Sequence, residues 1–575
     1  MVRDAHRIGA DLREIAALLG LSKDAARFKA KAYEQGALLV DSVGDVLGEL
    51  IGSGSLIDVK GIGPSLCRDI QEIWHTGCSS LLQRLREQHP LGTGQLAQIP
   101  GLTARRIGVL QEKLHVTSVA MLEELCRKHE VRGLPGFGAR VEERVLAGIE
   151  AARKPRRGPI RLRLAEALGL AERLREELQQ ALPSAQVELS GGVRRRDELV
   201  DEIALVIVGA EESAALDAVA GLSSVIYLNR ARCQARLSDG IGLSVYLAPS
   251  ESAGAGRVRA SSTGEHWAAL VERARERGLA LQVDGLYDHG QRLPQSGDEA
   301  GLYATLGLPA IPAELRGPWQ APGELFARDT FDDLLSEQDV RGAVHCHTTY
   351  SDGRNSIEEM ALAAEALGLE YITITDHSPL ASYAGGVTLD RLARQWDEIA
   401  EVQARVKIRI LRGTESDILA DGALDYPDSV LAQFDVIIAS IHGRFGMGRR
   451  EMTERLVRAM EQPVFKIWGH ALGRLLLERE PFECDVEAVL DALARSRGAV
   501  EINGDPYRLD LPPEWVPHAR KRGIPFVVSV DAHSTQGLNV LPYAVMMARR
   551  GGLRRDEVLN TRSVEAFMAQ VRPGT

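Results

Sequence analysis

From residue 341 onward, short apolar runs alternate with amphipathic helical patterns, and this alternation constrains the fold more than any other feature of the chain. The apolar runs have the length of strands and cover residues 343–347, 371–375, 406–411, 435–440, 464–468, 499–502 and 525–530. One helical pattern, 356–367, opens with Ser356 and Glu359, which have the spacing of a capping box. Repeated strand–helix units of this size predict a parallel α/β barrel, whose functional residues lie at the C-terminal ends of the strands.

Side chains of the metal-ligand type gather at these strand ends. His345 and His347 are two residues apart, so on a strand both imidazoles project to one face and Cys346 projects to the other. The full set is His345, His347, Asp352, His377, Glu415, His442, His470, Asp531 and His533. Any one of them could be a satisfied polar residue of the core, but nine that converge on one rim predict a metal centre. Mixed imidazole and carboxylate ligands favour Mn²⁺ or Zn²⁺ over Mg²⁺.

The chain is too long for one hydrophobic core, and its 575 residues predict three or four domains. The six cysteines are scattered, with no Cys-x-x-Cys pair, which favours reduced thiols and a cytoplasmic setting. We find no apolar run of membrane-spanning length, and the N-terminus lacks the apolar core of a signal peptide. We expect a cytoplasmic monomer with no membrane partner.

Charge is unevenly distributed along the chain. Residues 1–200 hold 30 Lys and Arg against 26 Asp and Glu, whereas the remainder holds 39 against 54. The acidic excess lies in the part that contains the predicted metal-binding carboxylates. The mildly basic part is where a polyanion could bind.

Three short turns in the basic part share one design, at residues 56–65, 96–103 and 133–140. Each is an apolar pair, a glycine turn and a helix start, and such a turn exposes backbone N–H groups that suit a phosphate. The pattern resembles the helix-hairpin-helix motif, which grips a DNA backbone without reading its sequence. The glycines expected to contact phosphate are Gly61, Gly63, Gly136 and Gly138; in the second turn Thr103 replaces the final glycine. Packed helical hairpins without a ligand are the alternative.

Residues 160–320 have the pattern of mixed α/β structure, and they follow a basic, proline-broken stretch at 153–159 that marks a domain boundary. A glycine pair opens a helix, arginines follow at positions 194–196, and an apolar strand comes next. This order is the layout of a nucleotidyltransferase triphosphate site. We therefore expect phosphate contacts from Gly191, Gly192, Arg194 and Arg195.

With these elements in place, the chain resembles the bacterial family X DNA polymerases that carry a C-terminal PHP phosphoesterase domain. The resemblance implies a multidomain fold with an all-α helix-hairpin-helix region, an α/β nucleotidyltransferase-like polymerase core and a distorted parallel (β/α) barrel of PHP type. The implied segments are an N-terminal helical domain with the first hairpin (1–85), a fingers-like helical region with the other hairpins (86–158), a palm-like domain (159–250), a thumb-like domain (251–317), a linker (318–340) and the PHP domain (341–575).

The resemblance also implies roles for the ligand-type residues, with up to three ions in the barrel. His345, His347, Glu415 and Asp531 would hold one ion; Glu415, His442 and His470 would hold a second; Asp352, His377 and His533 would hold a third. Glu415, His442 and Asp531 would act in catalysis through these ions. Arg444, two residues after His442, could meet a substrate phosphate.

The palm-like segment departs from the family pattern, which is Gly-Ser-x-Arg-Arg, then Asp-x-Asp on one strand and a third Asp on a neighbouring strand. Gly192 stands at the serine position, Glu202 and Ala204 stand at the Asp-x-Asp positions, and the third acid would fall near Ser244. An active polymerase needs all three carboxylates, because two magnesium ions must be held against the triphosphate and the primer 3′-oxygen. With the catalytic remnant Glu202 alone, we expect weakened Mg²⁺ or Mn²⁺ and dNTP binding and little or no nucleotidyl transfer. A divergent but active site in another alignment is the alternative.

The sequence leaves four functions open. The first is a DNA-binding repair protein whose PHP domain hydrolyses phosphodiesters, as an Mn²⁺-dependent 3′–5′ exonuclease or in end processing, on gapped, nicked or 3′-ended DNA of any sequence. The second is an active gap-filling DNA-directed DNA polymerase with that exonuclease attached. The third is a small-molecule phosphatase of the histidinol-phosphate type, and the fourth is a non-catalytic DNA-end binder. The complete ligand set and the missing palm-like carboxylates favour the first.

Overall fold

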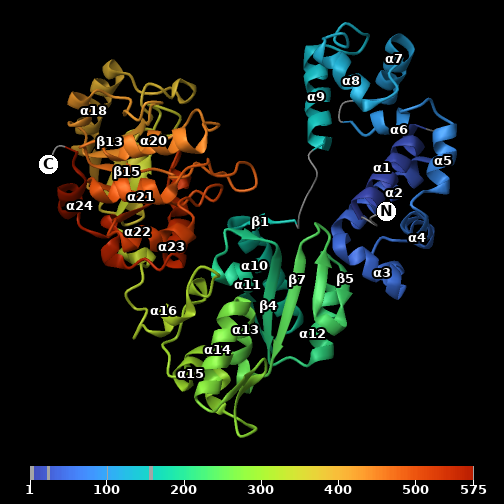
Figure 1. Cartoon of the computed structure of the whole chain (residues 1–575), viewed down its shortest axis with the longest axis horizontal. Helices are drawn as coiled ribbons and strands as arrows, with labels where there is room; N and C mark the ends of the chain where they lie inside the picture. The colour runs from blue at the N-terminus through green and yellow to red at the C-terminus, as the bar shows by residue number, and fades with distance from the viewer. Residues whose placement is uncertain (1–4, 22–25, 100–101, 154–159, 574–575) are drawn as a thin grey trace.

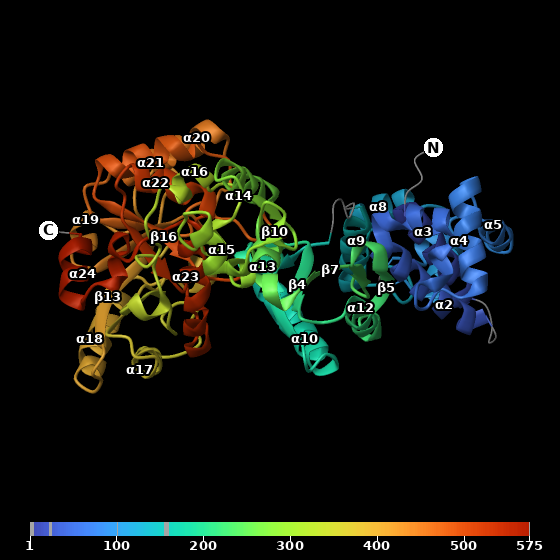
Figure 2. The ribbon, with the colours of Figure 1, turned by 90° about the horizontal axis from the view of Figure 1, so that it is seen from below.

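The computed structural model describes residues 5–21, 26–99, 102–153 and 160–573. Figures 1 and 2 show the N-terminal helices on one side, a sheet domain in the middle and a barrel on the other side. The predicted multidomain fold is confirmed. Two predicted features lie outside the described residues, namely the centre of the second turn (100–101) and most of the basic stretch (154–159).

The N-terminal region is helical throughout its described residues. Its helices are α1 (Ala5–Leu21), α2 (Ala26–Val43), α3 (Leu47–Ser53), α4 (Pro64–Thr76), α5 (Ser80–Glu87), α6 (Thr93–Leu96), α7 (Ala104–Leu114), α8 (Val119–Arg127) and α9 (Ala139–Arg153). Helices α1–α5 share one apolar core, and α6–α9 share a second. The first turn reaches α4 through Gly61, whose φ of +95° favours glycine, and Pro64 begins the helix. The third turn reaches α9 through Gly136, with φ +83°.

The middle domain is a five-stranded sheet in the order β2-β4-β7-β6-β5. Its strands are β2 (Gln186–Ser190), β4 (Glu202–Val208), β5 (Val225–Asn229), β6 (Gln234–Leu237) and β7 (Gly242–Ala248). The helices α10 (Leu164–Ala181), α11 (Gly191–Arg195) and α12 (Glu212–Gly221) accompany it, and β1 (Leu162–Arg163) pairs with β3 (Leu199–Val200) beside it. Strands β4 and β7 run parallel, so that Ala204 lies opposite Ser244 in the register. A metal site at the start of these two strands would therefore be lined by Glu202, Ala204 and Ser244.

The thumb-like segment has its own apolar core under α13 (Ala253–Ser261), α14 (Gly264–Glu276) and α15 (Glu299–Thr305), with a small sheet of β8 (Ala280–Gln282), β9 (Gly285–Asp288) and β10 (Gln291–Arg292). Residues 318–340 contain the short helix α16 (Pro322–Phe326). Leu325 from this segment packs into the thumb-like core, and Leu335 packs into the barrel core. The segment thus attaches to both neighbours rather than crossing free of them.

The barrel contains all seven predicted strands. They are β11 (Gly342–Cys346), β12 (Tyr371–Ile374), β13 (Arg409–Asp417), β14 (Val436–Ser440), β15 (Lys466–Trp468), β16 (Gly498–Asn503) and β17 (Phe526–Ser529). They follow chain order in the sheet, and each neighbouring pair is parallel. The last strand returns to the first, because Ala532 N–H donates to the carbonyl of His345 and His347 N–H donates to that of Ala532. The sheet therefore closes almost completely.

Helices cover the barrel. They are α17 (Ile357–Ala366), α18 (Leu389–Gln403), α19 (Asp428–Leu431), α20 (Arg449–Met460), α21 (Val486–Arg495), α22 (Val516–Lys521), α23 (Leu541–Arg550) and α24 (Val564–Val571). The predicted capping box is present, because Ser356 and Glu359 bond reciprocally at the start of α17. In the described part of the chain, no helix combines the length and apolar character that crossing a membrane requires.

The barrel docks onto the middle domain through buried charges. Arg550, which ends α23 and is 1% exposed, pairs with Asp197 and Glu198 just after α11. Its guanidinium also donates to the carbonyl of Arg195 at 2.8 Å. Arg474 from the barrel pairs with Glu198 at 3.1 Å. The segment that the sequence associates with a triphosphate therefore also holds the barrel.

Candidate metal centre

The strand ends of the barrel bring all nine predicted ligand-type residues together. Three groups have ligand atoms that all lie within 4.8 Å of one another: His347, Asp352, His377 and His533; His345, His347 and Asp531; and His377, Glu415 and His442. His470 joins them, because its Nε2 lies 2.8 Å from Glu415 Oε1. The nine residues lie together as expected, whereas their division into the three ligand sets that the resemblance implies stays a prediction.

Glu415 lies at the centre of the cluster and is 1% exposed. Besides His470, two imidazoles contact its oxygens closely, with His377 Nδ1 at 3.0 Å and His442 Nε2 at 3.1 Å. His345 and His347 lie slightly farther, at 3.4 and 3.6 Å. One carboxylate in the middle of five imidazoles has the position that a bridging ligand requires.

Several buried imidazole nitrogens show that the residues fit a metal. His345 Nε2 and both ring nitrogens of His347 are buried and have no hydrogen-bond partner among the described residues. The nearest oxygens, on Glu415 and Asp531, lie 3.4–3.6 Å from these Nε2 atoms, longer than ordinary hydrogen bonds. Buried polar atoms normally have partners, so a cation bound between the imidazoles and the carboxylates would complete the site.

His345 and His347 point into one cluster, as predicted, but the backbone that carries them is not a regular strand. The pairing of β11 with β12 shifts register between Ala343 and Cys346, and His345 has a φ of +68°. Two further ligand-type residues, His470 and Asp531, also have positive φ, of 24° and 48°. Such conformations are strained for non-glycine residues, and they concentrate where a site must aim side chains.

Two supporting carboxylates were missed in the sequence. Glu501 on β16 is fully buried and bonds His345 Nδ1 at 2.5 Å, and Asp417 at the end of β13 bonds His442 Nδ1 at 3.2 Å. A carboxylate behind a ligating imidazole fixes its orientation and tautomer. One signal was available, because Glu501 interrupts the apolar run 499–502.

The carboxylates raise the pKa of four imidazoles of the cluster, namely those of His345, His377, His442 and His533. Burial opposes the charge on His377, but Glu415 and Asp352 outweigh it and raise the pKa of His377 to about 10. Burial likewise opposes the charge on His442, and Glu415 and Asp417 raise its pKa to about 9. Burial dominates at His347 and lowers its pKa to about 3. At neutral pH, His377 and His442 are therefore protonated and His347 is neutral.

Metal binding should release protons, because a histidine ligates a metal only as the neutral imidazole. With raised pKa values at His377 and His442, we expect Mn²⁺ affinity to rise as the pH increases from 6.5 toward 9. Because His377 and His442 belong to different ligand sets, the log affinity of each of these two ions should rise by about one per pH unit near pH 7. Calorimetric titration with Mn²⁺ in buffers of different ionisation enthalpy measures the released protons. An affinity that does not change with pH would contradict this assignment.

The palm-like site has one of the three carboxylates that the family pattern requires. Glu202 begins β4, and the neighbouring positions Ala204 and Ser244 are buried without an acid. Burial and the adjacent Asp201 raise the pKa of Glu202, which weakens it as a cation ligand. The cavity beside it, about 240 Å³, is also lined by Glu49 from α3.

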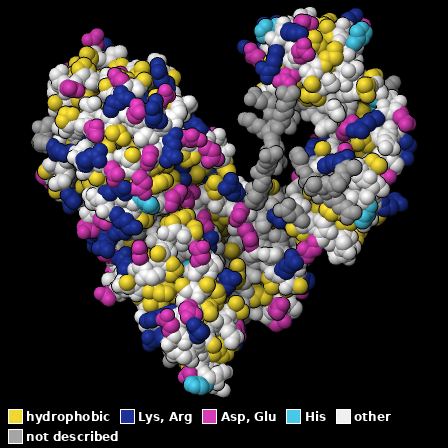
Figure 3. Space-filling view, viewed as in Figure 1, with side chains coloured by type: hydrophobic (Ala, Val, Ile, Leu, Met, Phe, Trp, Pro, Cys, Tyr) yellow, Lys and Arg dark blue, Asp and Glu magenta, His cyan; other side chains and the backbone are white. Residues whose placement is uncertain are grey.

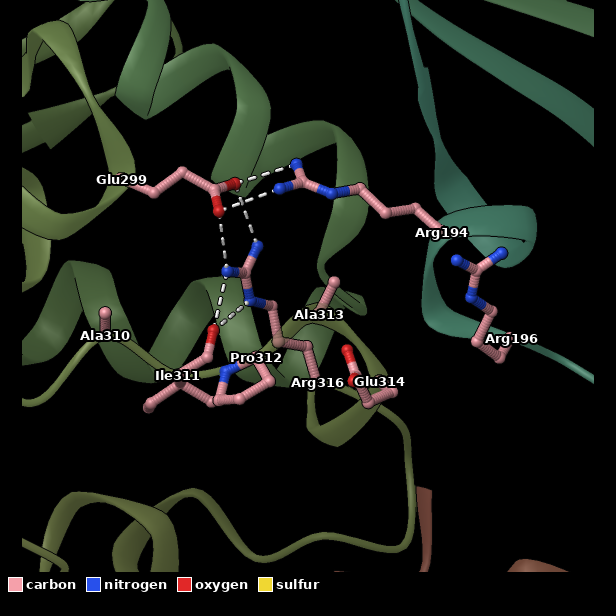
Figure 4. Close-up of a pocket in the computed structure, with 9 residues that line it drawn as sticks. All are labelled: Arg194, Arg196, Glu299, Ala310, Ile311, Pro312, Ala313, Glu314 and Arg316. Carbon is pink, nitrogen blue, oxygen red and sulfur yellow. Dashed lines mark hydrogen bonds and ion pairs between the residues drawn. The ribbon is translucent and has the colours of Figure 1, made fainter. Parts of the chain in front are cut away.

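The predicted phosphate-binding arginines already have carboxylate partners. Arg194 donates to both oxygens of Glu299 at 2.8 and 2.9 Å, and the buried Arg316 donates to the same oxygens at 3.2 and 3.1 Å (Figure 4). Arg195 donates to Asp197 at 2.6 Å. A triphosphate would have to compete with these ion pairs.

The glycine pair that opens α11 is tightly enclosed. A Cβ added to Gly192 would meet Asp197 Oδ2 at 2.7 Å, and one added to Gly191 would meet the Cβ of Ala204 at 2.6 Å. A serine at position 192 would therefore require Asp197 to move. Glycine avoids this contact.

The other predicted phosphate contacts lie at the surface. Gly61, Gly63 and Gly136 are exposed, and Gly138 is half-buried before α9. Beside Gly61, the Lys60 N–H donates to the Ile226 carbonyl at 3.0 Å, so the first hairpin rests against β5. Arg444, two residues after His442, is exposed with a φ of +62°.

Known proteins resemble both parts of the chain. A PHP domain model matches residues 343–504, and a DNA polymerase beta thumb model matches residues 258–317. A probable phosphatase of Caldanaerobacter subterraneus is 26% identical over 229 residues, which are 38% of this chain and 85% of the relative. A probable phosphatase of Caldicellulosiruptor bescii is 29% identical over 199 residues, 33% and 78% of the two chains.

One relative is similar along nearly the whole length. The DNA polymerase/3′-5′ exonuclease PolX of Bacillus subtilis is 32% identical over 557 residues, which are 94% of this chain and 95% of the relative. The shared order of helical region, sheet domain, thumb and barrel agrees with this match. This chain therefore belongs to the bacterial family X DNA polymerases that carry a C-terminal PHP domain.

Proposed function

We propose that this chain is a DNA repair enzyme whose barrel hydrolyses phosphodiester bonds as an Mn²⁺-dependent 3′–5′ exonuclease or end-processing enzyme. The contrast between the two candidate sites carries this proposal. Nine imidazole and carboxylate side chains converge in the barrel, whereas the palm-like site has Glu202 where three acids are needed. The name of the Bacillus subtilis relative includes both a polymerase and an exonuclease. We assign the exonuclease to this chain, with little or no nucleotidyl transfer.

The barrel residues would prepare a phosphodiester for attack by water. Bound divalent cations would polarise the phosphodiester, lower the pKa of a water molecule and neutralise the developing charge. The chain holds the ligands in place for this task, since Glu501 orients His345 and Asp417 orients His442. Arg444 supplies an exposed cation beside the cluster for a substrate phosphate.

We infer that DNA binds through local contacts in the N-terminal half without sequence preference. On the face shown in Figure 3, basic and acidic side chains are interspersed over the barrel and the N-terminal helices. The glycine turns are better suited to the backbone, because Gly61 and Gly136 leave N–H groups exposed at helix starts. Such contacts serve gapped, nicked and 3′-ended DNA alike.

A labelled primer–template with Mn²⁺ and all four dNTPs tests the proposal. We expect the primer to become shorter and not longer, because the barrel has its ligand set and the palm-like site lacks two acids. Extension that disappears in a Glu202→Ala variant would show that the palm-like site is active in a divergent form. A chain that binds the DNA but leaves it intact with Mn²⁺ or Zn²⁺ would be a non-catalytic end binder.

Two other enzymatic functions have specific support. Similarity to the Bacillus subtilis relative over 94% of this chain favours a gap-filling polymerase with the exonuclease attached. Partial similarity to probable phosphatases favours a small-molecule phosphatase. The same assay with p-nitrophenyl phosphate added distinguishes the phosphatase from the DNA-directed enzymes. A phosphatase would hydrolyse the monoester rapidly and leave DNA intact.

A further inference from the structure

The loop that follows the ligand-type residue His377 presents one large aromatic ring to solvent. Tyr383 lies in the short 3₁₀ turn Ser382–Ala384, between β12 and α18, and is 70% exposed. Its neighbours Ala381 and Ala384 are 1% and 4% exposed, so the backbone of the turn packs against the barrel while the ring projects outward. Large aromatic side chains usually bury much of their surface, which makes this exposure informative.

Hydrogen bonds hold the turn in one conformation. Ala381 N–H donates to the Ser378 carbonyl at 3.1 Å, and Val387 N–H donates to the His377 carbonyl at 2.8 Å. From α18, the Arg391 guanidinium donates to the Gly385 carbonyl at 2.6 Å. The ring is therefore mounted on a loop that is tied to a ligand-type residue at one end and to a helix at the other.

The ring stands at the edge of the metal centre. Its centroid lies 6.3 Å from that of His377 and 6.4 Å from that of His442, with the planes tilted by 56° and 60°. Among the described residues, the Tyr383 hydroxyl makes no hydrogen bond, and these two imidazoles are the aromatic neighbours of its ring. A flat apolar surface beside a phosphodiester-binding centre is placed where the base of a bound nucleotide would lie.

We propose that Tyr383 is the stacking platform for the 3′-terminal nucleobase of the strand whose phosphodiester lies on the metal centre. This inference rests on the proposed nuclease function and adds a substrate determinant to it. A stack on an aromatic ring accepts every base, since each base has a π-face, and an unpaired terminal base reaches the ring without first separating from a partner base. The platform thus selects a frayed or single-stranded 3′ end without selecting a sequence.

A second exposed tyrosine offers a matched comparison. Tyr507, in the loop after β16, is 54% exposed, but the Arg163 guanidinium from the palm-like domain lies over its ring at 4.5 Å. Its face is therefore already occupied by a cation–π contact, whereas that of Tyr383 is open. A Tyr507→Leu variant changes the same residue type on the barrel without removing the proposed platform.

The test compares two single-stranded oligonucleotides that differ only at the 3′ end, one with thymidine and one with a tetrahydrofuran abasic residue. For Tyr383→Leu we expect KM for the thymidine end to rise about 5- to 150-fold with kcat little changed. KM for the abasic end should not change. Tyr383→Phe and Tyr507→Leu should behave as the parent protein, and metal content should be equal in all variants. An unchanged KM in Tyr383→Leu, or an equal loss in Tyr383→Phe, would overturn the proposal.

Binding measurements test the stacking platform independently of the proposed nuclease function. Fluorescence anisotropy with the same two oligonucleotides in Ca²⁺ reports the end preference without hydrolysis. If the parent protein cleaves neither oligonucleotide in Mn²⁺ or Zn²⁺, the nuclease function fails, yet tighter binding of the thymidine end that depends on Tyr383 would still support the platform. Equal affinity for both ends in the parent protein would overturn the platform alone.

Discussion

Replacing Glu415 with Gln should reduce metal-dependent shortening of DNA by at least about 1,000-fold, equivalent to about 4 kcal/mol of transition-state stabilisation. The oxygens of Glu415 lie 2.8–3.6 Å from five imidazoles, and this residue is the common member of two implied ligand sets. A glutamine keeps the shape but removes the negative charge, and its amide NH₂ cannot ligate a cation. Hydrolysis of a 3′-labelled oligonucleotide in Mn²⁺ measures the loss.

Metal analysis and a surface control make this result specific. Mass spectrometry of bound metal should show fewer ions per chain in Glu415→Gln than in the parent protein. Glu401→Gln, at an exposed position of α18, should retain both full metal content and full activity. Unimpaired hydrolysis by Glu415→Gln with normal metal content would remove the proposed metal centre.

The second large effect concerns stability. Glu299→Ala should lower the local opening free energy of the thumb-like domain by about 3–5 kcal/mol, because it leaves the buried Arg316 beside Arg194 without their shared carboxylate. Figure 4 shows the two guanidiniums meeting on the single side chain of Glu299. Hydrogen exchange of peptides from α13 to α15 should accelerate by roughly 150- to 5,000-fold.

A nearby exposed acid provides the comparison. Among the described residues, the exposed Glu324 on α16 makes no ion pair, so Glu324→Ala should change the local opening free energy by less than about 0.5 kcal/mol. Glu299→Gln should fall between the two, because an amide oxygen still accepts a hydrogen bond but carries no charge. Equal protection in all variants would mean that the carbonyl of Ile311 and the hydroxyl of Ser261 are sufficient partners for Arg316.

The barrel was predictable from local pattern, because its strands are apolar and nearly uniform. The prediction was least accurate at β13, expected at 406–411 and found at Arg409–Asp417. The polar residues that follow Gly413 belong to the strand, although they look like a loop in the sequence. These strand residues are polar because they line the site, where ligand-type side chains take the place of apolar packing.

Other features depend on contacts between distant residues, which no local pattern contains. Glu501 supports His345 across 156 positions, and Arg550 reaches Asp197 across 353. The helix α16 was also missed, since Pro322–Phe326 is too short for a periodic signal. The palm-like departures could be identified early, because a missing carboxylate is visible in the sequence itself. The pairing of Ala204 with Ser244 in the sheet places these two positions of the family pattern side by side.

The buried anchor of Arg550 on Asp197 couples the glycine pair of α11 to the attachment of the barrel. A serine introduced at position 192 would press against Asp197, the residue with which Arg550 of the barrel pairs. A change that opened a triphosphate pocket at this turn would then loosen the attachment of the barrel. The turn that opens α11 and the docking of the barrel therefore cannot be altered independently of each other.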